Sequence, residues 1–202
     1  MSLAASNAIE RALMLGIQKQ WGPLLDSADK ASGIPAAFLA ALVANETGGK
    51  PDATRFEPAV FVALSEVLLG RKAAYGSLGA QDLNSRVDPG AGQARIKTPV
   101  AFAVLQNLAD LATSWGLTQI MGYEAIAYHV AIDDLSTPLS GITRTCIMLK
   151  DFAKRDALNV AVNFSELFDC WNTGRPHAPT ADPQYIPNGL ARMALYQSLE
   201  TQ

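Results

Sequence analysis

A segment of fifteen residues without a charge, between Lys30 and Glu46, limits the possible folds of this chain most strongly. The pattern predicts one helix that begins near Pro35, which suits a first helical turn, and ends at the glycine pair 48–49. Leucine and valine lie on one side of this helix and four alanines on the other, so no face is polar. Because a helix that is apolar all round is normally buried, we expect this one at the centre of the core.

Glu46 is the first charged residue after this segment, and it continues the stripe formed by Leu39, Leu42 and Val43 at helical spacing. We therefore expect its carboxyl group to emerge from the core into a cleft. Burial and, to a smaller extent, the negative end of the helix dipole should raise its pKa. An acid that stays protonated near neutral pH can protonate the leaving oxygen of a glycosidic bond. The alternative is a solvated helix end or a structural ion pair.

The composition limits the class of protein. At 202 residues, with 49% hydrophobic and 17% charged residues, the chain is long enough for one substantial core, and we expect a single domain over residues 1–202. The net charge of −3 argues against nucleic acid as a partner, since phosphate binding needs clustered Lys and Arg. Cys146 and Cys170 lack metal-ligand spacing, and we expect neither metal nor cofactor. We also expect a monomer without a transmembrane segment, and no export signal is visible.

Helical periodicity dominates the rest of the chain, whereas the alternation typical of strands is scarce. Two separate helices are predicted before the uncharged segment, the second over residues 23–31. Further helices are predicted from Pro58, from Pro99, and over residues 138–155, 164–171 and 187–199. Residues 70–98 contain five of the fifteen glycines, and we expect a long loop or lid there. The pattern as a whole predicts a mostly α fold.

Three short segments stand in a fixed order: ANETGG around Glu46, SWGLTQIMG at residues 114–122, and CWNTG at residues 170–174. Taken in this order, they resemble motifs of the goose-type lysozyme and soluble lytic transglycosylase superfamily, which cleaves the glycan strands of bacterial peptidoglycan. Thr47 stands where that family usually has Ser, and it keeps the hydroxyl. RFEPAVF at residues 55–61 adds similarity to the N-acetylmuramidase branch found in phage and bacterial lysins.

The resemblance covers residues 30–197 and implies a lysozyme-like helical domain with a central buried helix and a cleft between two lobes. It implies cleavage of the β-1,4 bond between N-acetylmuramic acid and N-acetylglucosamine, with peptidoglycan as the partner and the periplasm or cell wall as the place of action. Two alternatives remain open. One is a lytic transglycosylase that forms 1,6-anhydro ends, and the other is a non-catalytic glycan-binding or phage structural module of the same fold.

Glu46 is the predicted general acid, and Glu57 is the predicted second carboxylate. An inverting hydrolase needs a base that activates water, and a retaining one needs a nucleophile closer to the acid. Glu57 precedes Pro58, so its side chain is equally suited to cap the helix that begins there. Asp52 is a weaker alternative. A transglycosylase needs no second carboxylate, because the 6-hydroxyl of the sugar itself attacks.

The other predicted site residues would bind substrate: Thr47, Ser114, Trp115, Gly116, Gln119, Trp171, Asn172 and Tyr185. The amide of Gln119 suits sugar hydroxyls or an N-acetyl group, and Gly116 and Gly122 allow close backbone approach. Trp115 and Trp171 can stack on pyranose rings, although large aromatic residues are more often buried. Asn172 either binds an acetamido group or fixes the turn before Gly174. Tyr185 either bonds to Glu46 or anchors packing.

A thiol protease is the main reading that we set aside. Cys170, with His129 and His177 elsewhere in the chain, is the pairing that such an enzyme needs. The glycines that precede the nucleophile in those families are absent, so a small buried Cys is the better interpretation.

Overall fold

The computed structural model describes residues 3–87 and 99–200, most of which lie in helices. The predicted mostly α class is therefore confirmed. The helices are α1 (Leu3–Ser32), α2 (Ala36–Thr47), α3 (Pro58–Leu68), α4 (Ala80–Val87), α5 (Pro99–Leu111), α6 (Glu124–Ala127), α7 (Ile132–Ser136), α8 (Pro138–Arg155), α9 (Phe164–Thr173) and α10 (Tyr185–Glu200). The strands are β1 (Thr54–Phe56), β2 (Ala74–Tyr75), β3 (Leu78–Gly79), β4 (Thr113–Trp115) and β5 (Ile120–Met121). No helix in these ranges is both long and apolar enough to cross a membrane.

The chain divides into two compact units. Unit 1 comprises Met1–Pro51 and Pro138–Gln202, and unit 2 comprises Asp52–Thr137. Unit 1 is thus built from both ends of the chain, and unit 2 is the segment between them. The expectation of one functional domain over residues 1–202 stays a prediction.

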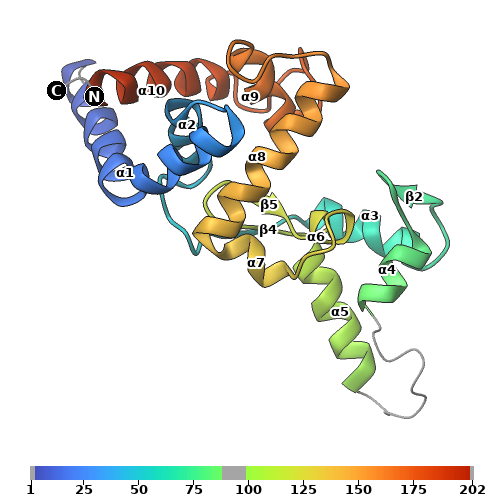
Figure 1. Cartoon of the computed structure of the whole chain (residues 1–202). Coiled ribbons are helices and arrows are strands. Elements are labelled where there is room, and N and C mark those ends of the chain that lie inside the picture. The colour runs from blue at the N-terminus through green and yellow to red at the C-terminus, as the bar shows by residue number, and fades with distance from the viewer. Residues whose placement is uncertain (1–2, 88–98, 201–202) are drawn as a thin grey trace. The chain divides into compact units, whose positions relative to one another are not determined.

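Helix α2 forms the centre of unit 1, as the uncharged segment predicts. Residues 36–44 are all buried, so every face of the helix is covered up to its last turn, and α1 and α10 pack against it (Figure 1). Burying each large apolar side chain of this segment contributes about 1.5–3 kcal/mol relative to leaving it exposed. The helix ends at Gly48, which has a left-handed φ of 62° and donates its N–H to the carbonyl of Ala44. Glycine adopts this conformation without the steric cost that a side chain would add.

Helix α1 runs without interruption through Pro23, whereas two separate helices were expected. A proline inside a helix costs roughly 3 kcal/mol because it lacks an N–H donor and crowds the preceding turn. Met14 and Ile17 before the proline and Leu25 after it are all buried, so one continuous helix keeps all three in the core. Helices α2, α8 and α10 contact α1, and this packing offsets the local cost.

An aromatic cluster joins α2, α9 and α10. The Phe38 ring lies 5.8 Å from the Phe164 ring and 4.5 Å from the Phe168 ring, between centroids. Gly189 of α10 faces Phe168, and a Cβ atom there would lie 2.7 Å from that ring. The absence of a side chain at residue 189 therefore sets how closely the start of α10 approaches α9.

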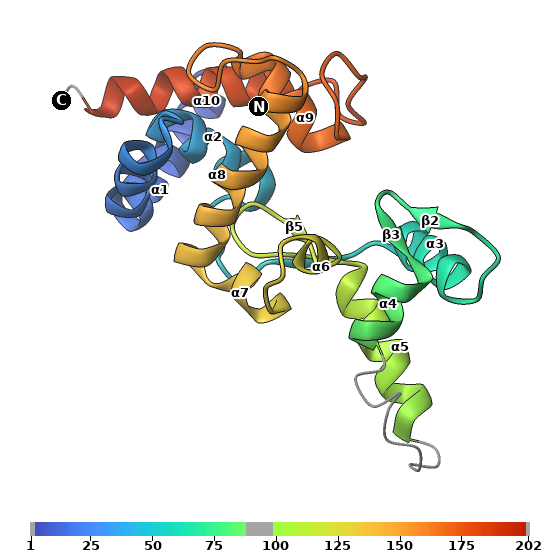
Figure 2. The ribbon, with the colours of Figure 1, turned by 45° about the vertical axis from the view of Figure 1, so that its right-hand side comes forward.

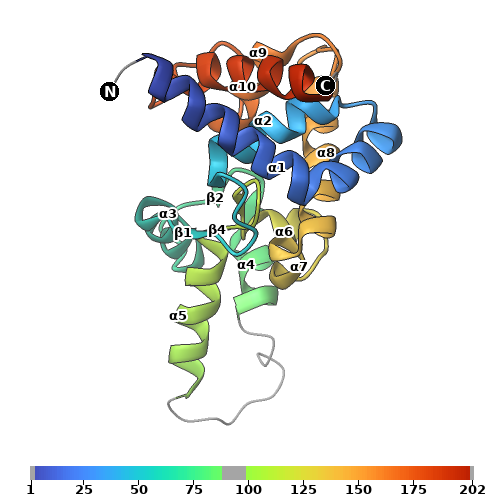
Figure 3. The ribbon, with the colours of Figure 1, turned by 90° about the vertical axis from the view of Figure 1, so that its left-hand side faces the viewer.

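Unit 2 combines short helices with a three-stranded antiparallel sheet of order β1-β4-β5. Figure 3 shows β1 beside β4, and their register pairs Arg55 with Ser114. These strands are two or three residues long, which is too short for the alternating pattern by which a sequence reveals strands. The core of the unit is formed by Leu64, Val67, Leu78, Leu83, Leu108, Leu111 and Ala112.

Residues 70–98 were expected to be a long loop, and the described part is more ordered. Strands β2 and β3 form a hairpin that is followed by α4 (Figure 2). Leu78 and Leu83 from this part are buried in the core of unit 2, which explains why it folds. Residues 88–98 of the expected loop lie outside the described residues.

Candidate functional site

Glu46 lies in the last turn of α2, and its side chain is half-buried. The hydroxyl group of Tyr185 donates a hydrogen bond to its Oε1 atom. Burial, together with the negative charge of Glu46 and this hydrogen bond, raises the pKa of Tyr185 above its ordinary value. The hydroxyl therefore stays protonated and remains a donor to the carboxyl group at any pH the protein meets.

Two contacts hold Tyr185 in this position. Its ring meets the Phe168 ring edge to face, with 6.2 Å between centroids and an interplanar angle of 85°. The side-chain amide of Asn45 donates to the backbone carbonyl of Tyr185 at 2.9 Å. Asn45 and Glu46 are neighbours on α2, so the end of this helix binds both the backbone and the hydroxyl of one residue at the start of α10.

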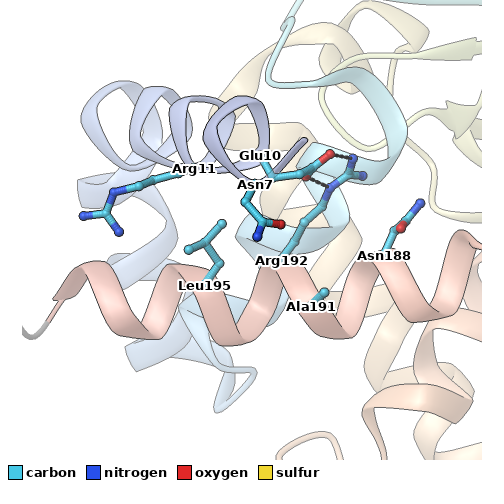
Figure 4. A pocket seen from close by; sticks show the side chains of 7 residues that line it. All are labelled: Asn7, Glu10, Arg11, Asn188, Ala191, Arg192 and Leu195. Carbon is cyan, nitrogen blue, oxygen red and sulfur yellow. Dashed lines mark hydrogen bonds and ion pairs between the residues drawn. The ribbon is translucent and has the colours of Figure 1, made fainter. Parts of the chain in front are cut away.

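Arg192 continues this network and is not among the residues predicted from the sequence. Its Nη1 donates to Oδ1 of Asn45 at 2.8 Å, while Nε and Nη2 donate to the two carboxylate oxygens of Glu10 at 2.7 and 2.9 Å. Figure 4 shows this two-point pairing across α1 and α10, with Arg11 extending away from it. A signal exists in the sequence, because Arg192 is the one basic residue of α10.

The Arg192 network lies beside a groove between α1 and α10, with a volume of about 570 Å³. Its lining consists of Asn7, Glu10, Arg11, Asn188, Ala191, Arg192 and Leu195 (Figure 4). Every guanidinium nitrogen of Arg192 already has an acceptor in the protein. Arg192 therefore joins α1, α2 and α10 by hydrogen bonds at the end of α2 that carries Glu46.

Replacing Arg192 by Met should destabilise the protein by about 1–3 kcal/mol at pH 7, because Asn45 and Glu10 lose their donor. The hydrogen bonds from Arg192 hold the pKa of Glu10 below its usual value. The Glu10 carboxylate therefore stabilises the folded state above its unfolded pKa, and this contribution is lost as the pH falls through the folded pKa. The difference between wild type and variant, measured by urea denaturation, should shrink as the pH falls below about 4.5.

The control for this prediction is Arg175→Met, which removes an exposed arginine side chain from the same unit. It should change stability by no more than about 0.5 kcal/mol. A difference between wild type and Arg192→Met that stays constant from pH 7 to pH 3 would contradict the role given to Glu10. Because Glu10 is partly exposed, solvent screening limits the size of the pH effect.

The remaining predicted residues of unit 1 surround the ends of α2 and α9. The Thr47 hydroxyl lies 3.3 Å from the carbonyl of Val43 within its own helix. Trp171 is half-buried and Asn172 is exposed, both in the last turn of α9. Thr173, not Asn172, bonds across the helix end, since its hydroxyl lies 2.8 Å from the carbonyls of Asp169 and Arg175.

Glu57 does not cap α3 with its side chain, which was the alternative role expected for it. It occupies the N-cap position of α3, yet its side chain makes no capping hydrogen bond. Its Oε1 accepts instead from Nε of Arg55 at 2.6 Å, and its backbone N–H donates to the carbonyl of Ala112 at 2.9 Å. The backbone of Glu57 is thus tied to the end of α5, while the carboxylate pairs with an exposed arginine.

Gln119 and Ser114 bond to each other and to their own unit. The amide nitrogen of Gln119 donates to the carbonyls of Ala53 and Gly116 at 3.0 and 3.1 Å. Its Oε1 accepts from the buried Ser114 hydroxyl at 2.8 Å. Both amide hydrogens of Gln119 therefore have acceptors inside unit 2, and the bond to Ala53 joins the residue before β1 to the turn between β4 and β5. A role of either residue in substrate binding stays a prediction.

Trp115 and Gly116 also make their contacts with other residues of unit 2. The indole N–H of Trp115 donates to the carbonyl of Asp110 at 3.0 Å. Gly116 is buried with a φ of +73°, and a Cβ atom there would lie 2.4 Å from the carbonyl oxygen of Leu135. The close backbone approach expected at Gly116 thus exists within unit 2, between its own segments.

The predicted site residues form two groups. Unit 1 brings together Glu46 and Tyr185 by a direct hydrogen bond and carries Thr47, Trp171 and Asn172 on α2 and α9. In unit 2, pairing of β1 with β4 brings the RFEPAVF and SWGLTQIMG segments together. Asn45, Arg192 and Glu10 belong to the network around Glu46 and were not predicted from the sequence.

Cys170 has the surroundings of a structural cysteine. It is fully buried, and its thiol lies 3.6 Å from Oδ2 of Asp156. Burial and this carboxylate raise the pKa of Cys170 to about 11. The thiolate, which is the nucleophile in thiol proteases, is therefore scarce at neutral pH.

Comparison with known proteins found no match for this chain among family models, curated proteins or solved structures. Among residues 3–87 and 99–200, no three or more His, Cys, Asp or Glu side chains are grouped so that they could hold a metal ion.

Proposed function

We propose that this protein is a peptidoglycan glycosidase that cleaves the β-1,4 bond between N-acetylmuramic acid and N-acetylglucosamine, with Glu46 as the general acid. We further propose a lysozyme-like fold for residues 1–202, with a cleft between two lobes. The observation that carries the proposal is the hydrogen bond from Tyr185 to Glu46 at the end of the buried helix α2. The order of the three motif segments supports it.

The physical argument concerns the orientation of the acid. A general acid is effective when its carboxyl group is held at a fixed position against the leaving oxygen. The rigid helix α2 fixes the backbone of Glu46, and Tyr185 fixes one carboxyl oxygen. The partial burial of the side chain removes part of its hydration shell, which strengthens interactions with a bound substrate.

The proposed reaction transfers the proton of Glu46 to the glycosidic oxygen while the bond from that oxygen to the anomeric carbon breaks. A water molecule supplies the new oxygen at the anomeric carbon, and Glu57 accepts its proton. Nε of Arg55 lies 2.6 Å from Oε1 of Glu57 and helps to hold this side chain in position. The product then carries a reducing end. The substrate would be met in the periplasm or cell wall, by a protein that acts as a monomer.

Digestion of purified peptidoglycan, followed by mass spectrometry of the released fragments, tests the type of reaction. We expect reducing ends, and we expect Glu57→Gln to slow their release at least about tenfold, because water then lacks its base. Asp52→Asn is the comparison variant, since Asp52 is an exposed carboxylate of the same unit and the alternative candidate for the base, and we expect it to release fragments at the wild-type rate.

Three other outcomes would revise the proposal. If the ends are 1,6-anhydro and Glu57→Gln is fully active, the protein is a lytic transglycosylase. If Asp52→Asn is impaired and Glu57→Gln is not, the base is Asp52. Binding of the glycan without any release of fragments would indicate a non-catalytic module.

A further inference from the structure

A second pocket lies in unit 2, where the β2–β3 hairpin meets the segment that leads into α6. Its volume is about 260 Å³, and it is lined by Tyr75, Gly76, Ser77, Leu78, Tyr123, Glu124 and Ala127. The Tyr75 and Tyr123 rings meet edge to face, 5.4 Å apart at an interplanar angle of 80°. This pocket, called the Tyr75 pocket below, is smaller than pockets for drug-sized ligands and suits a single ring.

Glu124 is the acidic residue of the Tyr75 pocket. Its side chain is half-buried, and within residues 3–87 and 99–200 it has neither a hydrogen bond nor an ion pair. Burial raises the pKa of Glu124, with no neighbouring charge to offset it. None of the described residues has a fully buried side-chain oxygen without a hydrogen-bond partner. The carboxylate oxygens of Glu124 therefore lie where solvent reaches them. Partial burial without a partner costs free energy, which a ligand with hydrogen-bond donors would recover.

We propose that the Tyr75 pocket binds one pyranose residue of a glycan. The tyrosine rings offer apolar surface to the C–H groups of the sugar, and Glu124 accepts hydrogen bonds from its hydroxyl groups. Ser77 is exposed at the hairpin turn and both donates and accepts. The choice of a glycan as ligand rests on the proposed function, whereas the pocket itself does not.

An organic cation is the competing ligand, because aromatic rings and a carboxylate also bind quaternary ammonium groups. The ammonium group of Lys72 already lies over the Tyr75 ring, 5.5 Å from its centroid. A second cation in the Tyr75 pocket would meet this positive charge at short range. A neutral sugar meets no such repulsion and makes use of the Ser77 hydroxyl, so the lining favours the sugar.

The test uses the full chain with Glu46→Gln, so that no substrate is cleaved, and the trimer of N-acetylglucosamine as the probe. Titration followed by NMR should shift the backbone amide signals of Ser77 and Glu124. Adding Glu124→Gln should raise the Kd measured from these signals about five- to tenfold, because a hydrogen bond to a charged group becomes one to a neutral group. Ser77→Ala should raise it about two- to tenfold. The control is Glu66→Gln, which changes a carboxylate of the same unit that pairs with Arg71, and it should leave the Kd unchanged.

Two results would overturn the inference. The first is that the trimer leaves the Ser77 and Glu124 signals unmoved, or that neither variant alters the Kd although both are folded by circular dichroism. The second is that tetramethylammonium at equal concentration displaces the trimer from these signals, which would assign the Tyr75 pocket to cations. The proposed function fails separately, by cell-wall cleavage that persists in Glu46→Gln, and that result leaves the NMR titration unaffected.

Discussion

Replacing Glu46 by Gln should reduce the rate of cell-wall clearing by about 10²–10⁴-fold, the usual contribution of a general acid. Gln has the shape of Glu and can still accept a hydrogen bond from the Tyr185 hydroxyl, so the fold should be retained. It carries no proton that it can transfer to a leaving oxygen. The measurement is the fall in turbidity of a suspension of bacterial cell walls, with circular dichroism to confirm folding.

The matched control for this prediction is Glu166→Gln. Glu166 is a half-buried glutamate on α9, in the same unit as Glu46. The Glu166→Gln variant should clear bacterial cell walls at the wild-type rate. Unchanged clearing by folded Glu46→Gln would remove the basis of the proposed function, and an equal loss in both variants would point to a general effect of charge on the unit.

Replacing Gly122 by Ala should destabilise the protein by about 3 kcal/mol or more, because the new methyl group cannot be accommodated without a backbone shift. Its Cβ atom would lie 2.1 Å from the carbonyl oxygen of Asp110, at the end of α5. The same oxygen accepts the indole N–H of Trp115, so the shift would also disturb that bond. Urea denaturation followed by circular dichroism measures the change in the free energy of unfolding.

Gly16→Ala is the control for Gly122→Ala, since it adds the same methyl group at an open position. Gly16 lies within α1, and nothing is within 4 Å of its Cβ position. Alanine there should stabilise the protein by about 0.5–1 kcal/mol through helix propensity. If Gly122→Ala and wild type have the same free energy of unfolding, the close contact between the backbone at Gly122 and the end of α5 is contradicted.

The two glycines of SWGLTQIMG have a different role in the structure from the one that the sequence motif suggested. In the sequence, Gly116 and Gly122 suggested room for a sugar. In the structure, both allow close contact between backbone segments of unit 2, with Leu135 and Asp110 as the neighbours. Glycine is needed wherever any backbone or ligand approaches closely, and the residue type does not reveal which of the two is present.

Local sequence predicted helices α2 and α8 well. Helix α8 covers residues 138–155 as predicted, because its apolar residues recur at helical spacing between Pro138 and the basic residues of its last turn. Helix α2 was predicted because an uncharged segment of that length has few places to lie other than the core. The position of Glu46 at the end of that helix was evident for the same reason.

Tertiary contacts decided the features that periodicity cannot encode. Helix α1 continues through Pro23 because buried residues on both sides keep it in the core. The hydrogen bond between Tyr185 and Glu46 joins residues 139 positions apart, and the pairing of Arg192 with Glu10 spans 182 positions.

The sequence by itself therefore determined the helical class, the buried helix α2 and the carboxylic acid at its end, since these depend on the order of apolar and charged residues within a single continuous segment. The partners of that acid, the bonds of Gln119 inside unit 2 and the Tyr75 pocket were decided only by the tertiary structure. Hydrogen-bond geometry is set by atoms that meet in space, and residues far apart in the chain meet only after the core has packed.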